Sequence, residues 1–90
     1  MKKRLKIKVF GFVQGVFFRA GAKEMADSLS LAGLATNLAD GSVGIIAEGE
    51  EENLKKLLSW AKRGPDLARV EKVDFFWQKP SGEFSDFQIK

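Results

Sequence analysis

The stretch that decides the fold is residues 5–29, which read LKIKVFGFVQGVFFRAGAKEMADSL. Apolar residues alternate with lysines over residues 5–9, and this period of two predicts a strand with one buried face, ending at Gly11. Apolar residues at helical spacing follow over residues 22–29 and predict a helix that stops at Gly33. A strand, a glycine-containing loop and a helix therefore follow one another directly.

The middle of the chain has the pattern of a hairpin followed by a second helix. An apolar run at residues 34–38 and a strand at residues 43–48 flank Asp40-Gly41, which is a strong hairpin-turn signal. Residues 50–63 begin with glutamates, carry leucines on one face and end with basic residues, an order that the helix dipole favours. Gly64-Pro65 is expected to stop this helix.

Two further strands complete the expected order. Alternation predicts a strand at residues 73–78, and Phe87 and Ile89 indicate a short last strand. The order β-α-β-β-α-β predicts an α+β, ferredoxin-like sandwich in which two helices cover one face of an antiparallel sheet. Right-handed crossovers give the strand order 4-1-3-2, with the short C-terminal strand as an addition. Residues 1–90 are expected to form a single domain.

The composition excludes several classes of chemistry. The chain has no histidine and no cysteine, so it offers no imidazole base, thiol nucleophile, disulfide or cysteine-based zinc site. Lysine and arginine total 15 against 12 acidic residues, and the net charge of +3 tolerates an anionic ligand without demanding nucleic acid. Neither a secretory signal nor an apolar stretch of about 20 residues is visible. We expect a cytoplasmic monomer with no membrane partner.

The segment from Gly11 to Arg19 is the first candidate for a functional site. Successive main-chain N–H groups in such a strand–loop–helix junction can form an anion-binding nest, and the helix start adds partial positive charge. Arg19 at that start can direct two N–H groups at phosphate oxygens. The simpler alternative is a tight turn with Arg19 in a surface salt bridge.

Residues 9–19, VFGFVQGVFFR, resemble the acylphosphatase signature G-x-V-Q-G-V-x-F-R at every characteristic position. Further blocks of that family appear in the same order along nearly the whole chain: Gly33–Asn37, Asp40–Val43, Gly49, Gly64-Pro65, Ala68–Val70 and Ser81–Phe84. The chain is thus similar to acylphosphatases, and residues 1–90 would be one acylphosphatase-like domain.

The resemblance implies a role for particular residues. Arg19 and Asn37 would be the catalytic pair, with Arg19 binding the phosphoryl group and Asn37 positioning the attacking water. The implied phosphate-binding set is Gln14, Gly15, Val16, Phe17, Phe18 and Arg19, with the loop residues acting through their N–H groups. The substrate itself would accept the proton of the water, and no metal or other cofactor would take part.

The implied reaction is hydrolysis of an acyl phosphate to a carboxylate and phosphate, and the residue inventory suits it. The leaving carboxylate has a conjugate acid of pKa about 4 and departs without a general acid. Acetyl, carbamoyl and glyceroyl phosphates are all compatible substrates. The sequence departs from the family pattern at Leu34, where an aromatic residue is usual, at Thr36, where a basic one is common, and at Gly44, which replaces a frequent glutamate. These departures bear on rate and substrate preference rather than on reaction type.

Two other classes of function stay open at this point. The same topology carries RNA-recognition motifs, and residues 11–18 superficially resemble their aromatic strand signature. That signature belongs on the third strand, however, whereas here it follows the first, so no nucleic-acid partner is expected. The second alternative is a non-catalytic phosphate-binding or small-ligand-binding domain, which would keep Arg19 without needing Asn37.

Overall fold

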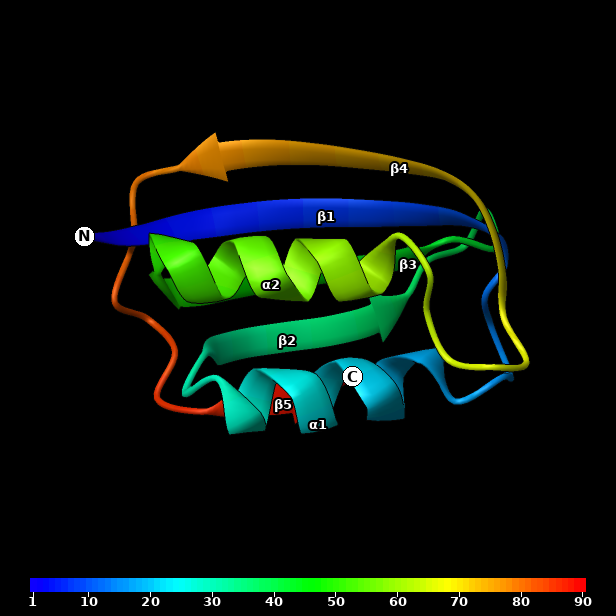
Figure 1. Cartoon of the computed structure of the whole chain (residues 1–90), viewed down its shortest axis with the longest axis horizontal. Coiled ribbons are helices and arrows are strands. Elements are labelled where there is room, and N and C mark those ends of the chain that lie inside the picture. The colour runs from blue at the N-terminus through cyan, green and yellow to red at the C-terminus, as the bar shows by residue number, and fades with distance from the viewer.

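Five strands and two helices follow one another in the order that the sequence predicts (Figure 1). The computed structural model describes all of residues 1–90. The elements are β1 (Lys2–Phe12), α1 (Phe18–Ser28), β2 (Ala32–Asn37), β3 (Val43–Glu50), α2 (Glu51–Ala61), β4 (Arg69–Gln78) and β5 (Phe87–Ile89). No helix combines the length and the apolar character that crossing a bilayer requires.

The strands form one sheet in the order β4-β1-β3-β2-β5. The expected order 4-1-3-2 is confirmed, and its pairs are antiparallel. The fifth strand makes the sheet mixed rather than wholly antiparallel, because β5 pairs with β2 in parallel. The direction of β5 follows from the chain path: β4 ends at the end of the sheet where β2 begins, so a strand that starts there and lies beside β2 runs the same way (Figure 1).

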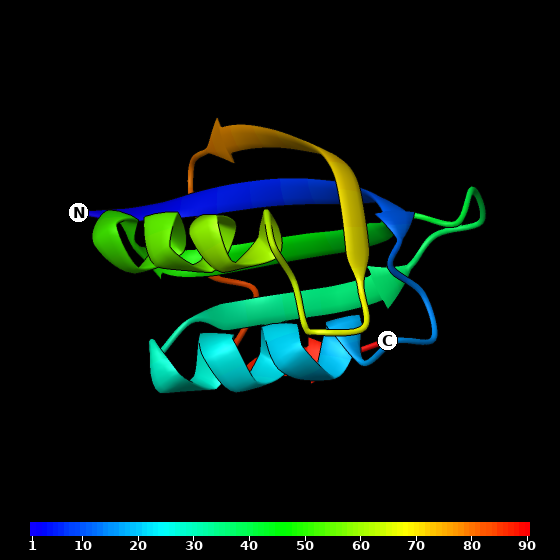
Figure 2. The ribbon, with the colours of Figure 1, turned by 45° about the vertical axis from the view of Figure 1, so that its right-hand side comes forward.

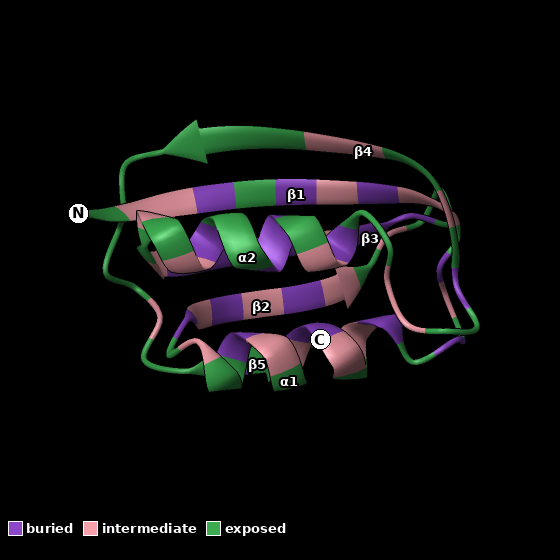
Figure 3. Cartoon of the chain, in the orientation of Figure 1, coloured by how far each residue is buried: buried purple, intermediate pink, exposed green.

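Both helices cover the same face of the sheet, and the core lies between the two layers. The alternation in β1 buries Leu5, Ile7 and Val9 beneath them, while Lys6 points to solvent. The helices present their alanines and leucines inward, and their outer faces are exposed (Figure 3). The rings of Phe18 and Trp60 pack with centroids 5.1 Å apart, which joins α1 to α2.

Two glycines expected to end elements lie inside strands instead. β1 continues through Gly11 to Phe12, and the register against β4 shifts between Phe10 and Gly11, so this glycine marks a bulge rather than a strand end. Gly33 lies within β2, where a side chain would meet the main-chain oxygen of Ile46. The backbone of Gly33 approaches its neighbour strand too closely for any other residue.

The helix α1 begins at Phe18, one residue before the expected start at Arg19, and ends at Ser28. Its stop is a Schellman motif built on Ser30, which has a left-handed φ of 56°. The N–H of Leu31 donates to the carbonyl of Ala26, and that of Ser30 donates to the carbonyl of Asp27. In α2 the predicted acidic first turn is confirmed by Glu51 and Glu52, with Glu50 as the residue before the helix.

A buried carboxylate fixes the connection between β4 and β5. Glu48 in β3 accepts hydrogen bonds from the N–H groups of Ser81 (2.8 Å) and Gly82 (2.9 Å) and from the Ser81 hydroxyl (2.8 Å). It also pairs with Arg4 at 3.2 Å. These contacts, the Glu48 clamp, tie Ser81 and Gly82 of the connection between β4 and β5 to the sheet.

Candidate functional site

The loop of residues 13–17 joins β1 to α1 and has an unusual backbone. Gly15 has φ 75° and Phe17 has φ 66° and ψ 23°, so left-handed residues stand on either side of Val16. Alternation of this kind turns successive N–H groups toward one side and forms an anion-binding nest. A bulky aromatic residue rarely adopts this conformation, and such strain concentrates at functional sites.

The main-chain N–H groups of this loop have no hydrogen-bond acceptor within the protein. Those of Gly15, Val16 and Phe17 donate to no other main-chain or side-chain group of the chain. The first turn of α1 follows at once, and its own N–H groups and dipole add positive potential at the same place. The loop and the helix start together form a concave surface that suits a tetrahedral anion.

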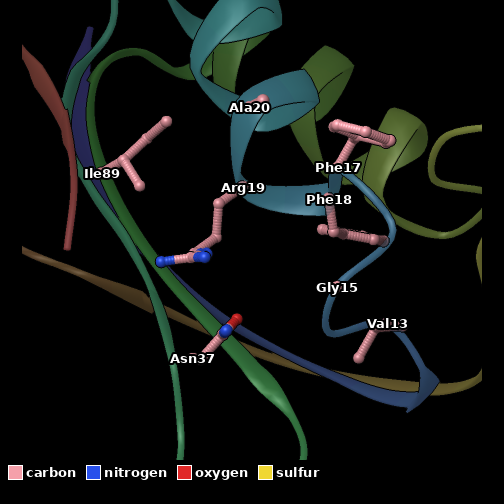
Figure 4. A pocket seen from close by; sticks show the side chains of 8 residues that line it. All are labelled: Val13, Gly15, Phe17, Phe18, Arg19, Ala20, Asn37 and Ile89. Atoms are coloured by element: carbon pink, nitrogen blue, oxygen red, sulfur yellow. The ribbon is translucent and has the colours of Figure 1, made fainter.

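A pocket of about 260 Å³ opens beside this loop (Figure 4). Figure 4 shows the guanidinium of Arg19, from the first turn of α1, and the amide of Asn37, from the end of β2, facing the same space. No lining residue is a carboxylate. The pocket is lined by Val13, Gly15, Phe17, Phe18, Arg19, Ala20, Asn37 and Ile89.

The C-terminal strand orients Arg19. Its Nη1 atom donates to the main-chain oxygen of Lys90 at 2.8 Å, and the Lys90 N–H donates to Ala35 of β2 at 2.8 Å. Figure 2 shows the end of the chain beside the start of α1. Arg19 forms no salt bridge with any Asp or Glu side chain. Only its Nη1 atom is engaged within the chain, by an oxygen of Lys90, which leaves the other guanidinium N–H groups for an anion in the pocket.

Asn37 also lines the pocket. It is the last residue of β2 and is paired in register with Val43 of β3. Its side chain is exposed and makes no hydrogen bond within the chain. An amide of this kind can both donate and accept, which is what holding a water molecule in one orientation requires.

Two members of the predicted phosphate-binding set do not line the pocket with their side chains. Val16 is buried in the core, with 4% of its surface exposed. The Gln14 side chain turns toward the loop between β2 and β3, where it donates to the main-chain oxygens of Leu38 (2.8 Å) and Ser42 (2.9 Å). Both residues can reach a ligand only through their N–H groups, as predicted, whereas Gly15, Phe17 and Phe18 line the pocket.

The sequence did not point to four contributors to the site. Val13, Ala20 and Ile89 supply apolar walls, and Lys90 supplies the oxygen that holds Arg19. Val13 and Ile89 look like ordinary strand residues, and a main-chain oxygen has no sequence signal at all. Only the tertiary pairing of β5 with β2 brings Ile89 and Lys90 to the site.

Asp40 has the turn role that its Asp-Gly sequence predicts. Its carboxylate accepts hydrogen bonds from the hydroxyl and the N–H of Ser42 and pairs with Lys8 at 2.9 Å. These contacts hold the pKa of Asp40 far below its usual range, and the hydrogen bond from the Ser42 hydroxyl has the largest effect. Asp40 therefore ties the hairpin loop of residues 38–42 to β1 through an ion pair.

The family model and the curated relatives of this chain agree on one family. The family model described as Acylphosphatase matches residues 5–89. An acylphosphatase of Methylococcus capsulatus is 45% identical over 87 residues, which cover 97% of this chain and 95% of that protein. One from Caldanaerobacter subterraneus subsp. tengcongensis is 43% identical and covers 99% of both chains. The crystal structure of acylphosphatase from Bacillus subtilis has a TM-score of 0.93 at 33% identity, covering 100% of this chain and 99% of that chain.

Proposed function

The chain belongs to the acylphosphatase family, and on that premise we propose that the pocket beside loop 13–17 hydrolyses acyl phosphates without a metal ion. The substrate class is an acyl phosphate, in which a carboxyl oxygen is bonded to phosphorus. Water adds to phosphorus, the bond from phosphorus to the carboxyl oxygen breaks, and the electron pair leaves with the carboxylate. The second product is inorganic phosphate.

The assignment of this pocket as the active site rests on one observation. The nest of loop 13–17, the Arg19 guanidinium and the Asn37 amide come from separate elements and meet at one pocket. The loop N–H groups and the guanidinium bind the phosphoryl oxygens, which carry the negative charge in both ground and transition states. Because the Arg19 Nη1 atom is already fixed by Lys90, the guanidinium is preorganised for this task.

Asn37 acts on the water rather than on the anion. Its amide holds the water against phosphorus, opposite the leaving carboxyl oxygen, and a phosphoryl oxygen of the substrate takes the proton that the water releases. A loose phosphoryl-transfer transition state demands positioning and charge stabilisation rather than covalent chemistry. Arg19, Asn37 and the loop N–H groups supply both.

The chemistry of the lining supports a metal-independent reaction. A carboxylate leaving group of conjugate-acid pKa about 4 needs neither a general acid nor a Lewis acid to depart. The pocket offers none of the oxygen-rich carboxylate ligands that divalent cations prefer, and the chain has no histidine or cysteine. Arg19 and the main-chain dipoles then supply the positive charge that a metal supplies elsewhere.

The proposal extends to the setting of the enzyme: a cytoplasmic monomer with no nucleic-acid ligand. A net charge of +3 is small for a protein that binds a phosphate backbone. The glycine–aromatic segment 11–18 lies at the end of the first strand and in the loop after it, whereas an RNA-recognition motif carries this signature on its third strand. These two features support a small-molecule substrate.

Paired variants test whether Arg19 binds the phosphoryl group and Asn37 positions the water. Arg19→Ala should weaken binding of inorganic phosphate about 30- to 150-fold, because it removes charge-assisted hydrogen bonds worth about 2–3 kcal/mol at a half-exposed site. Asn37→Ala should bind phosphate within about threefold of wild type but lose about 100-fold in kcat. Binding is measured by calorimetry and turnover by hydrolysis of an aryl acyl phosphate. Arg63→Ala, at an exposed residue beyond α2, controls for the lost charge.

Two results would contradict this assignment. Normal phosphate binding by Arg19→Ala would show that the anion binds elsewhere, and wild-type kcat for Asn37→Ala would remove its role with the water. Both variants should remain folded by circular dichroism, since neither side chain belongs to the buried core.

A further inference from the structure

The loop 13–17 and the hairpin loop 38–42 lie at the same end of the sheet (Figure 2) and are joined by one side chain. Gln14 uses both N–H bonds of its amide. One donates to the Leu38 oxygen at 2.8 Å and the other to the Ser42 oxygen at 2.9 Å. No other hydrogen bond connects residues 13–17 with residues 37–42.

The two oxygens that Gln14 contacts are the ones that close the hairpin loop. The Leu38 N–H donates to the Ser42 oxygen at 2.8 Å, and the Gly41 N–H donates to the Leu38 oxygen at 3.1 Å. On the far side the loop is braced by Asp40, which pairs with Lys8 of β1. Gln14 therefore binds a loop that is closed by its own hydrogen bonds, at the residues where the loop begins and ends.

The neighbours of these residues in the sequence are the reacting parts of the site. Gln14 directly precedes Gly15 of the nest, and Leu38 directly follows Asn37. A hydrogen bond from Gln14 to Leu38 therefore relates the N–H groups that bind phosphate to the amide that holds the water. No other side chain spans this gap with a hydrogen bond.

We propose that Gln14 is a positioning residue whose side-chain amide sets the placement of Asn37 relative to the anion-binding N–H groups. The inference rests on the proposed function, because it assigns Gln14 to the attack of water within that reaction. The reaction is sensitive to this distance, since a misplacement of about 1 Å at a catalytic group can lower a rate about 100-fold. Phosphate binding uses loop 13–17 and Arg19, which are contiguous at the start of α1, so it depends less on this distance than the attack of water does.

The test removes the two donors while keeping the length of the side chain. Gln14→Met should lower kcat for an aryl acyl phosphate about 10- to 100-fold and change the Kd for inorganic phosphate by less than about threefold. Gln78→Met, at the exposed end of β4 and far from the pocket, is the matched control and should leave both quantities unchanged. If Gln14→Met does not fold, Gln14→Asn withdraws the same amide by one methylene and carries the same expectation.

A double variant separates positioning from a general structural effect. If Gln14 acts through Asn37, then Gln14→Met should lower kcat no further in an Asn37→Ala background. The inference is overturned if kcat of the Gln14 variant equals that of wild type, if phosphate Kd weakens as much as kcat falls, or if the two effects multiply. An inactive wild-type protein would instead refute the proposed function itself, so the two failures are distinguishable.

Discussion

Replacing Glu48 by glutamine should destabilise the protein far from the pocket, through the connection that leads to β5. The substitution keeps the size of the side chain and one acceptor oxygen. It removes the charge that pairs with Arg4 and places an NH2 donor against the donors of one carboxylate oxygen, which are either Gly82 alone at Oε1 or Arg4 and Ser81 at Oε2. In the better orientation the side chain at position 48 thus changes from a charged group that satisfies four donors to a neutral one that satisfies three and opposes the fourth, Gly82.

The geometry sets the size of the effect. Hydrogen bonds to a charged group contribute about 1.5–3 kcal/mol each, and they are not additive within one network. The side chains of Arg4 and Glu48 are 18% and 9% exposed, so solvent screens their interaction only weakly. Losing one of the four contacts and the charge assistance of the other three gives an expected loss of roughly 2–4 kcal/mol in the free energy of unfolding. For a chain of this size that lowers Tm by roughly 10–25 °C.

The effect should also depend on pH, with a sign fixed by the pKa of Glu48. Burial raises that pKa, but the hydrogen bonds from Ser81 and Gly82 and the pairing with Arg4 outweigh it and lower the pKa below its ordinary value. A carboxyl group with a lowered folded-state pKa stabilises the fold fully above its unfolded pKa of about 4.3. That stabilisation is lost as the pH falls through the folded-state pKa. The difference between wild type and Glu48→Gln should therefore shrink below about pH 4.

Urea unfolding followed by tryptophan fluorescence at pH 7 and at pH 3 measures both quantities. Glu52→Gln is the matched control, since Glu52 is exposed in the first turn of α2 and forms no salt bridge. Its loss should stay below about 1 kcal/mol. The reasoning is refuted if Glu48→Gln is no more destabilising than Glu52→Gln, or if its loss is the same at both pH values.

Three further outcomes follow from the structure. Gly33→Ala should destabilise the fold by roughly 3 kcal/mol or more in the same unfolding assay, because its Cβ would overlap the main-chain oxygen of Ile46 in the neighbouring strand; a loss under about 1 kcal/mol would contradict the close approach. Arg19→Lys should bind phosphate at least about tenfold more weakly by calorimetry, because a point charge cannot reproduce the guanidinium fork; wild-type affinity would contradict a bidentate role. Inorganic phosphate and sulfate should inhibit hydrolysis competitively, because the nest recognises the tetrahedral anion rather than the acyl group; a steady-state titration that shows no competition would contradict this.

The sequence predicts the elements of this fold well and their ends less well. Periodicity identifies β1 and both helices, since burial on one side imposes it. Gly11 and Gly33 mislead because glycine at a bulge or a close strand contact has the same sequence signal as glycine at an element end. The actual stop of α1 uses Ser30 in a left-handed conformation, which composition does not reveal. The parallel pairing of β5 depends on the path of the chain after β4 and has no local signal.

The candidate site divides in the same way. The signature around Gly15 and Arg19 predicts the loop and its cation, because a nest needs particular residues in a fixed order. Contacts made through the main chain, such as Lys90 to Arg19, depend on tertiary structure and leave no trace in side-chain identity. The two hydrogen bonds of Gln14 belong to this second group: the residue is part of the signature, but its partners are main-chain oxygens from another loop.

The central claim is that Arg19 and main-chain N–H groups carry the hydrolysis of acyl phosphates without a metal. The most direct measurement is the rate of phosphate release from a synthetic aryl acyl phosphate by the purified protein, with and without EDTA, for wild type and Arg19→Ala. We predict that wild-type activity is the same in both conditions and that Arg19→Ala loses it in both. Wild-type activity that EDTA abolishes and an added divalent cation restores would contradict the claim.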